Sequence, residues 1–236
     1  MCDACDLVFI RHEEAEGNVI AVRSKFFSDH SGFSEEFRSK PSIDWKLTEE
    51  GKSRAMNLGK WVRESFDLAN FQLLTSPVLR AKETAGFILP AHFWQECPEV
   101  RGRLWGGIEC LPWNEWPEHC KQHGLAGLPS GFREVYPNGE SMGAVYDRIG
   151  DFLKTVTRNA IVVTHGENLL AVRMHFGNIP EDQFSELEKN GRHARNGHLI
   201  WYSKRNPLTG WCSSEFSFKR EYFEGIDSGW EKLPVE

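Results

Sequence analysis

Residues 7–12 read LVFIRH, and residues 161–165 read IVVTH. Each stretch is a short, uninterrupted apolar run that ends in a polar residue and a histidine. Apolar runs of this length without alternation are typical of strands buried on both faces, as in a parallel sheet. The two stretches therefore predict two inner strands, each with a histidine directly after it.

Helix signals lie between and after these strands. Thr48 can cap a first helix, Ser76 can open a second and Ser141 can start a third, and apolar residues follow each of them at helical spacing. A fourth helix is predicted over residues 169–176, ended by Gly177. Alternating strands and helices predict a three-layer α/β/α sandwich with a mostly parallel central sheet.

The remaining segments are less regular. HLIWYSK (198–204) and EFSFKREYF (215–223) predict two strands in the C-terminal tail. Segments 19–46 and 90–140 carry no regular pattern, and long irregular segments of compact domains commonly form binding loops. We therefore predict a single domain over residues 1–236, in which these insertions lie over the active site and shape the substrate pocket.

Composition limits the classes of function. The 236 residues carry a formal net charge of −6, which argues against a nucleic-acid partner, because such proteins need a basic face. No apolar run is long enough for a membrane span, so we expect no membrane association and a cytoplasmic location. Six cysteines are too sparse for a disulfide scaffold, and most are expected to be free thiols.

The residues after the two strands predict an anion site. In an open α/β sheet, residues at the carboxyl ends of strands line the ligand crevice, which would bring Arg11, His12 and His165 together. A histidine there could be a metal ligand, a general base, a nucleophile or a core residue. The adjacent arginine favours an anion over a metal cation. Arg80, early in a predicted helix, adds a second cation for phosphate.

Five segments in order resemble one protein family. They are LVFIRHEEAEGN (7–18), LTEEGKSRAMNLG (47–59), TSPVLRAKETA (75–85), YPNGES (136–141) and VVTHGENL (162–169). Together they resemble the motifs of the histidine phosphatase superfamily, whose fold is phosphoglycerate-mutase-like. The resemblance extends from about residue 6 to about residue 204, and five ordered matches are far more specific than any one of them.

The resemblance implies a role for each matching residue. His12 matches the histidine that becomes phosphorylated, His165 the second histidine of the pocket, and Arg11 and Arg80 the arginines that hold phosphate. Asn18 matches an asparagine that contacts phosphate. We therefore expect a phosphomonoesterase that acts on a small phosphorylated metabolite without metal or cofactor. The alternatives are a phosphoglycerate-type mutase and a non-catalytic module that binds a phosphorylated ligand. Nothing in the sequence indicates an oligomeric state.

The sequence departs from the family pattern at two positions. Glu13 stands where the family has glycine after the first histidine, so its carboxylate must be turned away or paired. Gly102 stands where the family usually has a glutamate that acts as general acid. We expect Glu109, which follows a glycine-rich turn, to supply the proton, with Glu99, Glu115 and Glu13 as alternatives.

Two further features leave alternatives open. Arg101 and Arg103 flank the position of the missing acid, where they could bind a second anionic group of the substrate or lie at the surface. His119 and His123, with Cys120 between them, give a weak metal pattern. For the segment that holds these two histidines we expect a polar face of a helix or loop.

Overall fold

A central sheet of seven strands organises the protein. The computed structural model describes residues 5–189 and 194–234. The sheet order is β3-β2-β4-β1-β5-β6-β7. The first four strands in this order are mutually parallel, and β5, β6 and β7 each run antiparallel to the preceding neighbour. The strands are β1 (Asp6–Arg11), β2 (Gln72–Thr75), β3 (Gln95–Glu96), β4 (Ala160–Thr164), β5 (Leu199–Ser203), β6 (Phe218–Phe223) and β7 (Ile226–Lys232).

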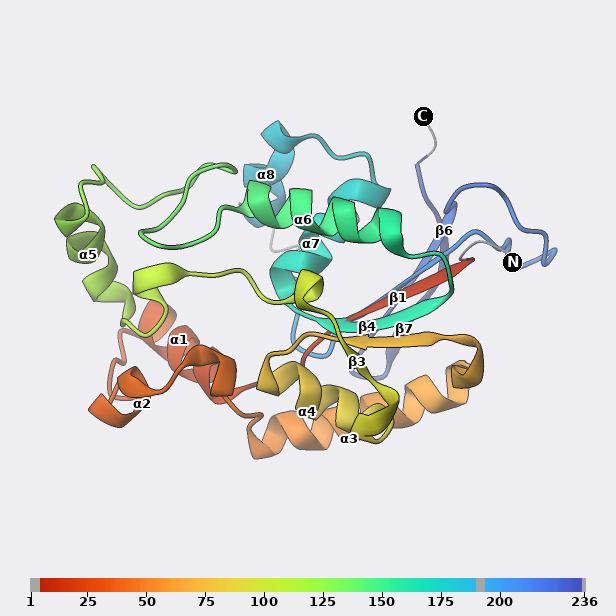
Figure 1. Cartoon of the computed structure of the whole chain (residues 1–236), viewed down its shortest axis with the longest axis horizontal. Coiled ribbons are helices and arrows are strands. Elements are labelled where there is room, and N and C mark those ends of the chain that lie inside the picture. The colour runs from red at the N-terminus through yellow and green to blue at the C-terminus, as the bar shows by residue number, and fades with distance from the viewer. Residues whose placement is uncertain (1–4, 190–193, 235–236) are drawn as a thin grey trace.

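Helices cover both faces of this sheet, as Figure 1 shows. Helices α3 and α4 lie on one face, and α6 and α7 lie on the other. The predicted three-layer α/β/α arrangement is confirmed. The helices are α1 (Glu16–Phe27), α2 (Glu35–Ser39), α3 (Glu49–Ser65), α4 (Leu79–Ile88), α5 (Trp116–Gln122), α6 (Met142–Thr155), α7 (Gly166–Phe176) and α8 (Phe184–Lys189).

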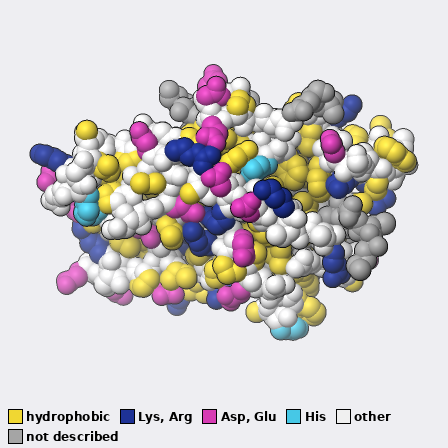
Figure 2. Space-filling view, turned by 45° about the horizontal axis from the view of Figure 1, so that its top comes forward, with side chains coloured by type: hydrophobic (Ala, Val, Ile, Leu, Met, Phe, Trp, Pro, Cys, Tyr) yellow, Lys and Arg dark blue, Asp and Glu magenta, His cyan; other side chains and the backbone are white. Residues whose placement is uncertain are grey.

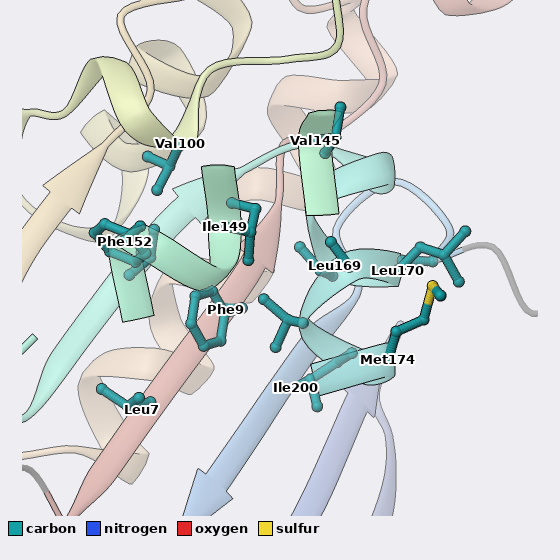
Figure 3. Close-up of a cluster of buried hydrophobic side chains, with 14 of the residues drawn as sticks. Leu7, Phe9, Val100, Val145, Ile149, Phe152, Leu169, Leu170, Met174 and Ile200 are labelled. Atoms are coloured by element: carbon teal, nitrogen blue, oxygen red, sulfur yellow. The ribbon is translucent and has the colours of Figure 1, made fainter. Parts of the chain in front are cut away.

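The two inner strands divide the core into two clusters. Side chains alternate between the faces of a strand, so Leu7 and Phe9 of β1 pack against α6 and α7 (Figure 3). Val8 and Ile10 pack on the other side, against α3 and α4. Both faces of β1 are thus apolar and buried, which explains why its sequence shows no polar alternation.

Two of the predicted helix starts are confirmed. Thr48 Oγ1 accepts a hydrogen bond from the backbone N–H of Gly51 at 2.9 Å and caps α3. Ser141 Oγ accepts from the backbone N–H of Ala144 at 3.0 Å and caps α6. These side chains satisfy backbone donors that the first turn of a helix leaves without intrahelical partners.

Three details differ from the predictions. Helix α4 starts only at Leu79, with Val78 at its N-cap position. Ser76 lies before the helix, where its hydroxyl bonds to a histidine and accepts from the backbone N–H of Val78 at 3.3 Å. Helix α7 begins earlier than predicted and ends at Gly177 as expected. The tail forms the two predicted strands and a third, β7, reached through a tight turn with positive φ at Glu224 and Gly225. Exposed positions dominate β7, so no apolar pattern predicted it.

The two insertions lie together beyond one end of the sheet. Figure 1 shows α1, α2 and α5 grouped at the end opposite the N-terminus, where β1 delivers its carboxyl end. A buried cluster around Ile108, Cys120 and Tyr136 holds the second insertion together. The insertions therefore stand next to the predicted site.

The surface charges, the helix lengths and the cysteines can be compared with the expectations from composition. In Figure 2, acidic and basic side chains are intermixed across the face shown. No helix among the described residues is long and apolar enough to cross a bilayer. Among the cysteines that the structure describes, those at positions 97, 110, 120 and 212 are free thiols. Cys2 lies outside the described residues.

Candidate active site

The two histidines meet at the carboxyl ends of neighbouring parallel strands. Arg11 of β1 pairs with Thr164 of β4, and the backbone N–H of His12 donates to Thr164 O at 2.9 Å. The ring centroids of His12 and His165 are 5.0 Å apart, with a T-shaped arrangement. Both side chains are buried. The expected juxtaposition of the two imidazoles is confirmed.

The hydrogen bonds of His12 fix its tautomer. Nδ1 lies 2.7 Å from the carbonyl oxygen of Glu13, which can only accept, so Nδ1 carries the proton. The lone pair is then on Nε2, which accepts from Arg80 Nε at 3.0 Å. Burial, followed by the charges of Arg80, His165 and Arg11, holds the pKa of His12 well below 6.5. His12 is therefore a neutral imidazole whose Nε2 lone pair accepts a hydrogen bond from a guanidinium.

Arg80 is held in place on two sides. Its Nη1 donates to Ser42 O at 2.9 Å, and its Cζ lies 5.9 Å from the centre of the Trp45 ring. Both partners belong to the first insertion. Burial lowers the pKa of Arg80 to about 10, which still leaves it charged at neutral pH. The guanidinium is thus a fixed cation beside His12 Nε2.

Arg11 supplies the second cation. Its Nη1 donates to Ala194 O, and its buried Nε meets no acceptor among the residues described. A buried donor without a partner is costly, and an anion bound beside it would satisfy it. Gly166 leaves room for the Arg11 guanidinium, since a Cβ at this position would lie 3.3 Å from it. Burial lowers the pKa of Arg11.

His165 is oriented by a residue that the sequence reasoning did not identify. Ser76 Oγ lies 2.8 Å from His165 Nε2, and both side chains are buried. Ser76 follows the apolar strand β2, so the rule that located the two histidines would also have located this serine. Burial, then the charges of Arg80 and Arg11, holds the pKa of His165 well below 6.5.

Gly102 lies against the other side of the His165 ring. A Cβ built on Gly102 would be 3.2 Å from His165 Nδ1. The position that carries the acid in the family is thus next to the second histidine, as the motif spacing implied. Because glycine stands here, this position has no side chain that could donate a proton.

Asn18 is connected by hydrogen bonds to the loop that carries His12. It occupies the first turn of α1, where its Oδ1 accepts from Ala15 N at 3.0 Å and from Asn196 Nδ2 at 3.2 Å. Asn196 Nδ2 also lies 3.2 Å from His12 O. The structure therefore connects Asn18 to the His12 loop through Asn196, which no motif had indicated.

Glu13 is paired, which resolves the first departure from the family pattern. Its carboxylate lies 3.2 Å from Arg54 Nε and packs against Gly197, where a Cβ would overlap it. The Glu13 side chain is only 4% exposed. Burial raises the pKa of Glu13, and Arg54 opposes that shift. This carboxylate is bound to α3 and is not available to a substrate.

We expect Arg54→Ala to reduce the free energy of unfolding by about 3 kcal/mol, because it leaves the buried Glu13 carboxylate without its cation. Lys52→Ala is the matched control on the same helix. Its partner Glu49 is 90% exposed, so a loss below about 0.5 kcal/mol is expected. Urea unfolding of the three proteins measures both changes, and equal losses in the two variants would contradict this account.

The other three candidate acids differ in the contacts that their carboxylates make. Glu115 accepts two hydrogen bonds from Arg38, at 2.9 and 2.7 Å. Glu99 is exposed and accepts from Cys97 Sγ. The Glu109 carboxylate has no ion pair within the described part of the chain, and its charge raises the pKa of Arg80 against the effect of burial. Glu109 is thus the candidate that has no ion pair among the described residues and whose charge acts on Arg80.

The two arginines beside Gly102 have different surroundings. Arg101 binds the carboxylate of Glu140 at 2.9 and 3.2 Å, and Arg148 binds the same carboxylate. Glu140 is 10% exposed, so Arg101 belongs to a largely buried ion-pair network. Arg103 donates to the backbone of Glu140 and lies 4.5 Å from the Trp105 ring. Of these two arginines, Arg103 is the one that lines the cavity between the insertions.

The weak metal pattern of the second insertion gains no support. The rings of His119 and His123 are 4.3 Å apart, and Cys120 is buried in the local core. Within residues 5–189 and 194–234, no three His, Cys, Asp or Glu side chains group as metal ligands would.

The two buried histidines predict a pH dependence of stability. In the unfolded chain they titrate near 6.5, whereas their pKa values in the folded protein are lower. Below pH 6.5 the unfolded state therefore binds more protons, so stability falls as the pH falls, by up to about 1.4 kcal/mol per pH unit for each histidine. We expect the free energy of unfolding, measured with urea at several pH values between 6.5 and 5, to fall less steeply with falling pH in His165→Asn than in the wild type. Identical slopes would exclude a neutral buried His165.

Comparison with known proteins identifies the family. The model of the histidine phosphatase superfamily (branch 1) matches residues 7–212. The chain belongs to this superfamily. It is accordingly an enzyme of the phosphatase class. No curated protein matches the sequence.

Solved structures share the fold. A putative alpha-ribazole-5'-P phosphatase from Escherichia coli str. K-12 substr. MG1655 has a TM-score of 0.63 at 18% identity, over 99% of this chain and 100% of that one. A mycobacterial glucosyl-3-phosphoglycerate phosphatase has a TM-score of 0.60 at 17% identity, over 85% and 93% of the two chains. TTHB049 from Thermus thermophilus has a TM-score of 0.53 at 22% identity, over 89% and 98%. At these identities the likeness concerns the fold.

Proposed function

We propose that the protein is a metal-independent phosphomonoesterase that acts through a phosphohistidine at His12. The observation that carries this proposal is the neutral His12 imidazole, with its proton on Nδ1 and its Nε2 lone pair 3.0 Å from Arg80 Nε. This arrangement combines a nucleophile with a fixed cation for the phosphoryl oxygens. Arg11, with its unpaired buried Nε, supplies a second donor to the same group.

The reaction then proceeds in two displacements. His12 Nε2 attacks phosphorus, the bond from phosphorus to the alcohol oxygen breaks, and that oxygen takes a proton from a carboxylic acid. Water next attacks the phosphohistidine, returns a proton to the carboxylate and releases phosphate. The Glu13 carbonyl holds Nδ1–H throughout, which stabilises positive charge on the phosphorylated ring. We assign the acid to Glu109.

Turnover in ¹⁸O-labelled water with a chelator present tests this proposal. A phosphatase places one solvent oxygen in the released phosphate and works without added metal. A mutase would transfer the phosphoryl group to a second hydroxyl and leave solvent oxygen out of the product. A phosphate-binding module would bind inorganic phosphate and show no turnover above the His12→Ala background across a panel of phosphomonoesters.

The role of Glu109 predicts a dependence on the leaving group. We expect Glu109→Gln to lower kcat/KM for an alkyl phosphate by about 100-fold, because an alkoxide needs a proton to leave. The loss for p-nitrophenyl phosphate should be less than about 5-fold, since nitrophenolate leaves without one. Glu115→Gln, at a carboxylate bound to Arg38, is the matched control. Equal losses of Glu109→Gln on both substrates would assign the proton to another group.

A further inference from the structure

A large cavity lies between the two insertions. Its volume is about 690 Å³, within the range that encloses a whole organic molecule of drug size. A glycerate-sized alcohol would fill only a small part of it. We call it the aromatic chamber, because rings from both insertions form its walls, among them Phe33, Phe37, Trp45, Trp105, Trp113 and Trp116.

Residues of the chamber wall lie next to residues that contact His12 and His165. Trp45 packs over the guanidinium of Arg80, and that guanidinium bonds to His12. Arg103 follows Gly102, which lies against the His165 ring. The Glu109 side chain also lines the chamber, and its charge acts on Arg80. An alcohol leaving His12 toward Glu109 would therefore occupy the chamber.

The charges of the chamber suit a flat ring better than a sugar. Three of its lining residues are charged: Lys25, Arg103 and Glu109. Lys25 Nζ lies 4.6 Å from the Trp113 ring, and Arg103 Cζ lies 4.5 Å from the Trp105 ring. Both cations thus rest on aromatic faces. The hydroxyl side chains of the lining are Ser24, Ser130 and Tyr136, a small set for the many hydroxyls of a sugar or polyol. Aromatic walls favour a ring that can stack or meet them edge to face.

We infer that the natural substrate is a phosphomonoester of an alcohol that bears a large aromatic group, which the aromatic chamber holds while His12 takes the phosphoryl group. The inference rests on the proposed function, since it names the alcohol released by that reaction. It also revises the expected small metabolite toward a bulkier substrate.

A matched pair of substrates tests the inference. 2-(2-Naphthyl)ethyl phosphate and ethyl phosphate both release a primary alcohol, so the difference between them reports contacts of the ring and not leaving-group reactivity. We expect kcat/KM to be about 100-fold higher for the naphthyl compound, given the apolar area that it buries. Trp113→Ala should reduce this ratio about 10-fold. Trp211→Ala, at a 70% exposed ring outside the chamber, should leave the ratio unchanged.

The outcomes separate this inference from the proposed function. Turnover of both phosphates with similar kcat/KM values would overturn the inference and leave the phosphatase standing. Turnover of neither would overturn the proposed function. In that event, calorimetry with 2-(2-naphthyl)ethylphosphonate and ethylphosphonate decides the inference: tighter binding of the naphthyl compound, weakened in Trp113→Ala, supports it, and equal dissociation constants exclude it.

Discussion

His12→Ala is expected to lower kcat/KM for phosphomonoesters by about 10⁵-fold, to the level of the background reaction in the site. The loss is this large because the variant removes the atom that forms the covalent bond, and no second nucleophile stands in its place. Steady-state kinetics gives the fold-change, and rapid acid-free quenching followed by mass spectrometry gives the phosphohistidine.

The controls for this variant separate chemistry from folding. His92→Ala removes an exposed imidazole in the short 3-10 turn Ala91–Phe93, which follows α4, and should keep full activity and the same melting temperature. His12→Ala should remain folded, because it deletes a buried ring that contributes one backbone hydrogen bond. Activity above about one tenth of wild type in folded His12→Ala, far beyond what loss of a nucleophile permits, would exclude the phosphohistidine route.

Arg80→Ala is expected to lower kcat/KM by about 10³-fold, because the guanidinium is the cation fixed beside the nucleophilic nitrogen. Arg80→Lys should recover no more than about tenfold of this loss. A lysine ammonium is a point charge and cannot reproduce the planar guanidinium that meets both His12 and Ser42. Steady-state kinetics on one alkyl phosphate measures both variants.

Lys82→Ala is the matched control for the Arg80 variants. It lies on the same helix, and its exposed side chain pairs with Glu96. Its activity should stay within about twofold of wild type, as for a surface ion pair. If Arg80→Ala and Lys82→Ala behaved alike, Arg80 would serve to hold the first insertion and not the phosphoryl group.

The sequence predicted those parts of the fold and site that depend on local patterns. Apolar runs located β1 and β4, and the residues directly after them located His12 and His165. Motif order placed Arg80 and Asn18 beside them. For the two histidines the local sequence determines where the side chain goes, because a residue that follows an inner strand must emerge at the sheet edge.

The remaining features depend on contacts between distant segments. Ser76 was assigned to a helix start, yet its hydroxyl bonds to a histidine 89 positions away. Asn196 contacts both the His12 loop and Asn18, and no local pattern encodes that contact. The aromatic chamber forms only where two insertions meet, so their irregular sequences could indicate a binding role but not its chemistry.

The contacts of Trp45 have a consequence for the evolution and redesign of this enzyme. A Cβ on Gly17 would lie 2.0 Å from the Trp45 ring, so α1 holds that ring in place, and Trp45 and Ser42 in turn hold Arg80. The segment that we propose to select the alcohol thus also positions Arg80. Exchanging the 19–46 loop between relatives would therefore alter turnover together with substrate preference, and new specificities should arise more readily through changes in the second insertion.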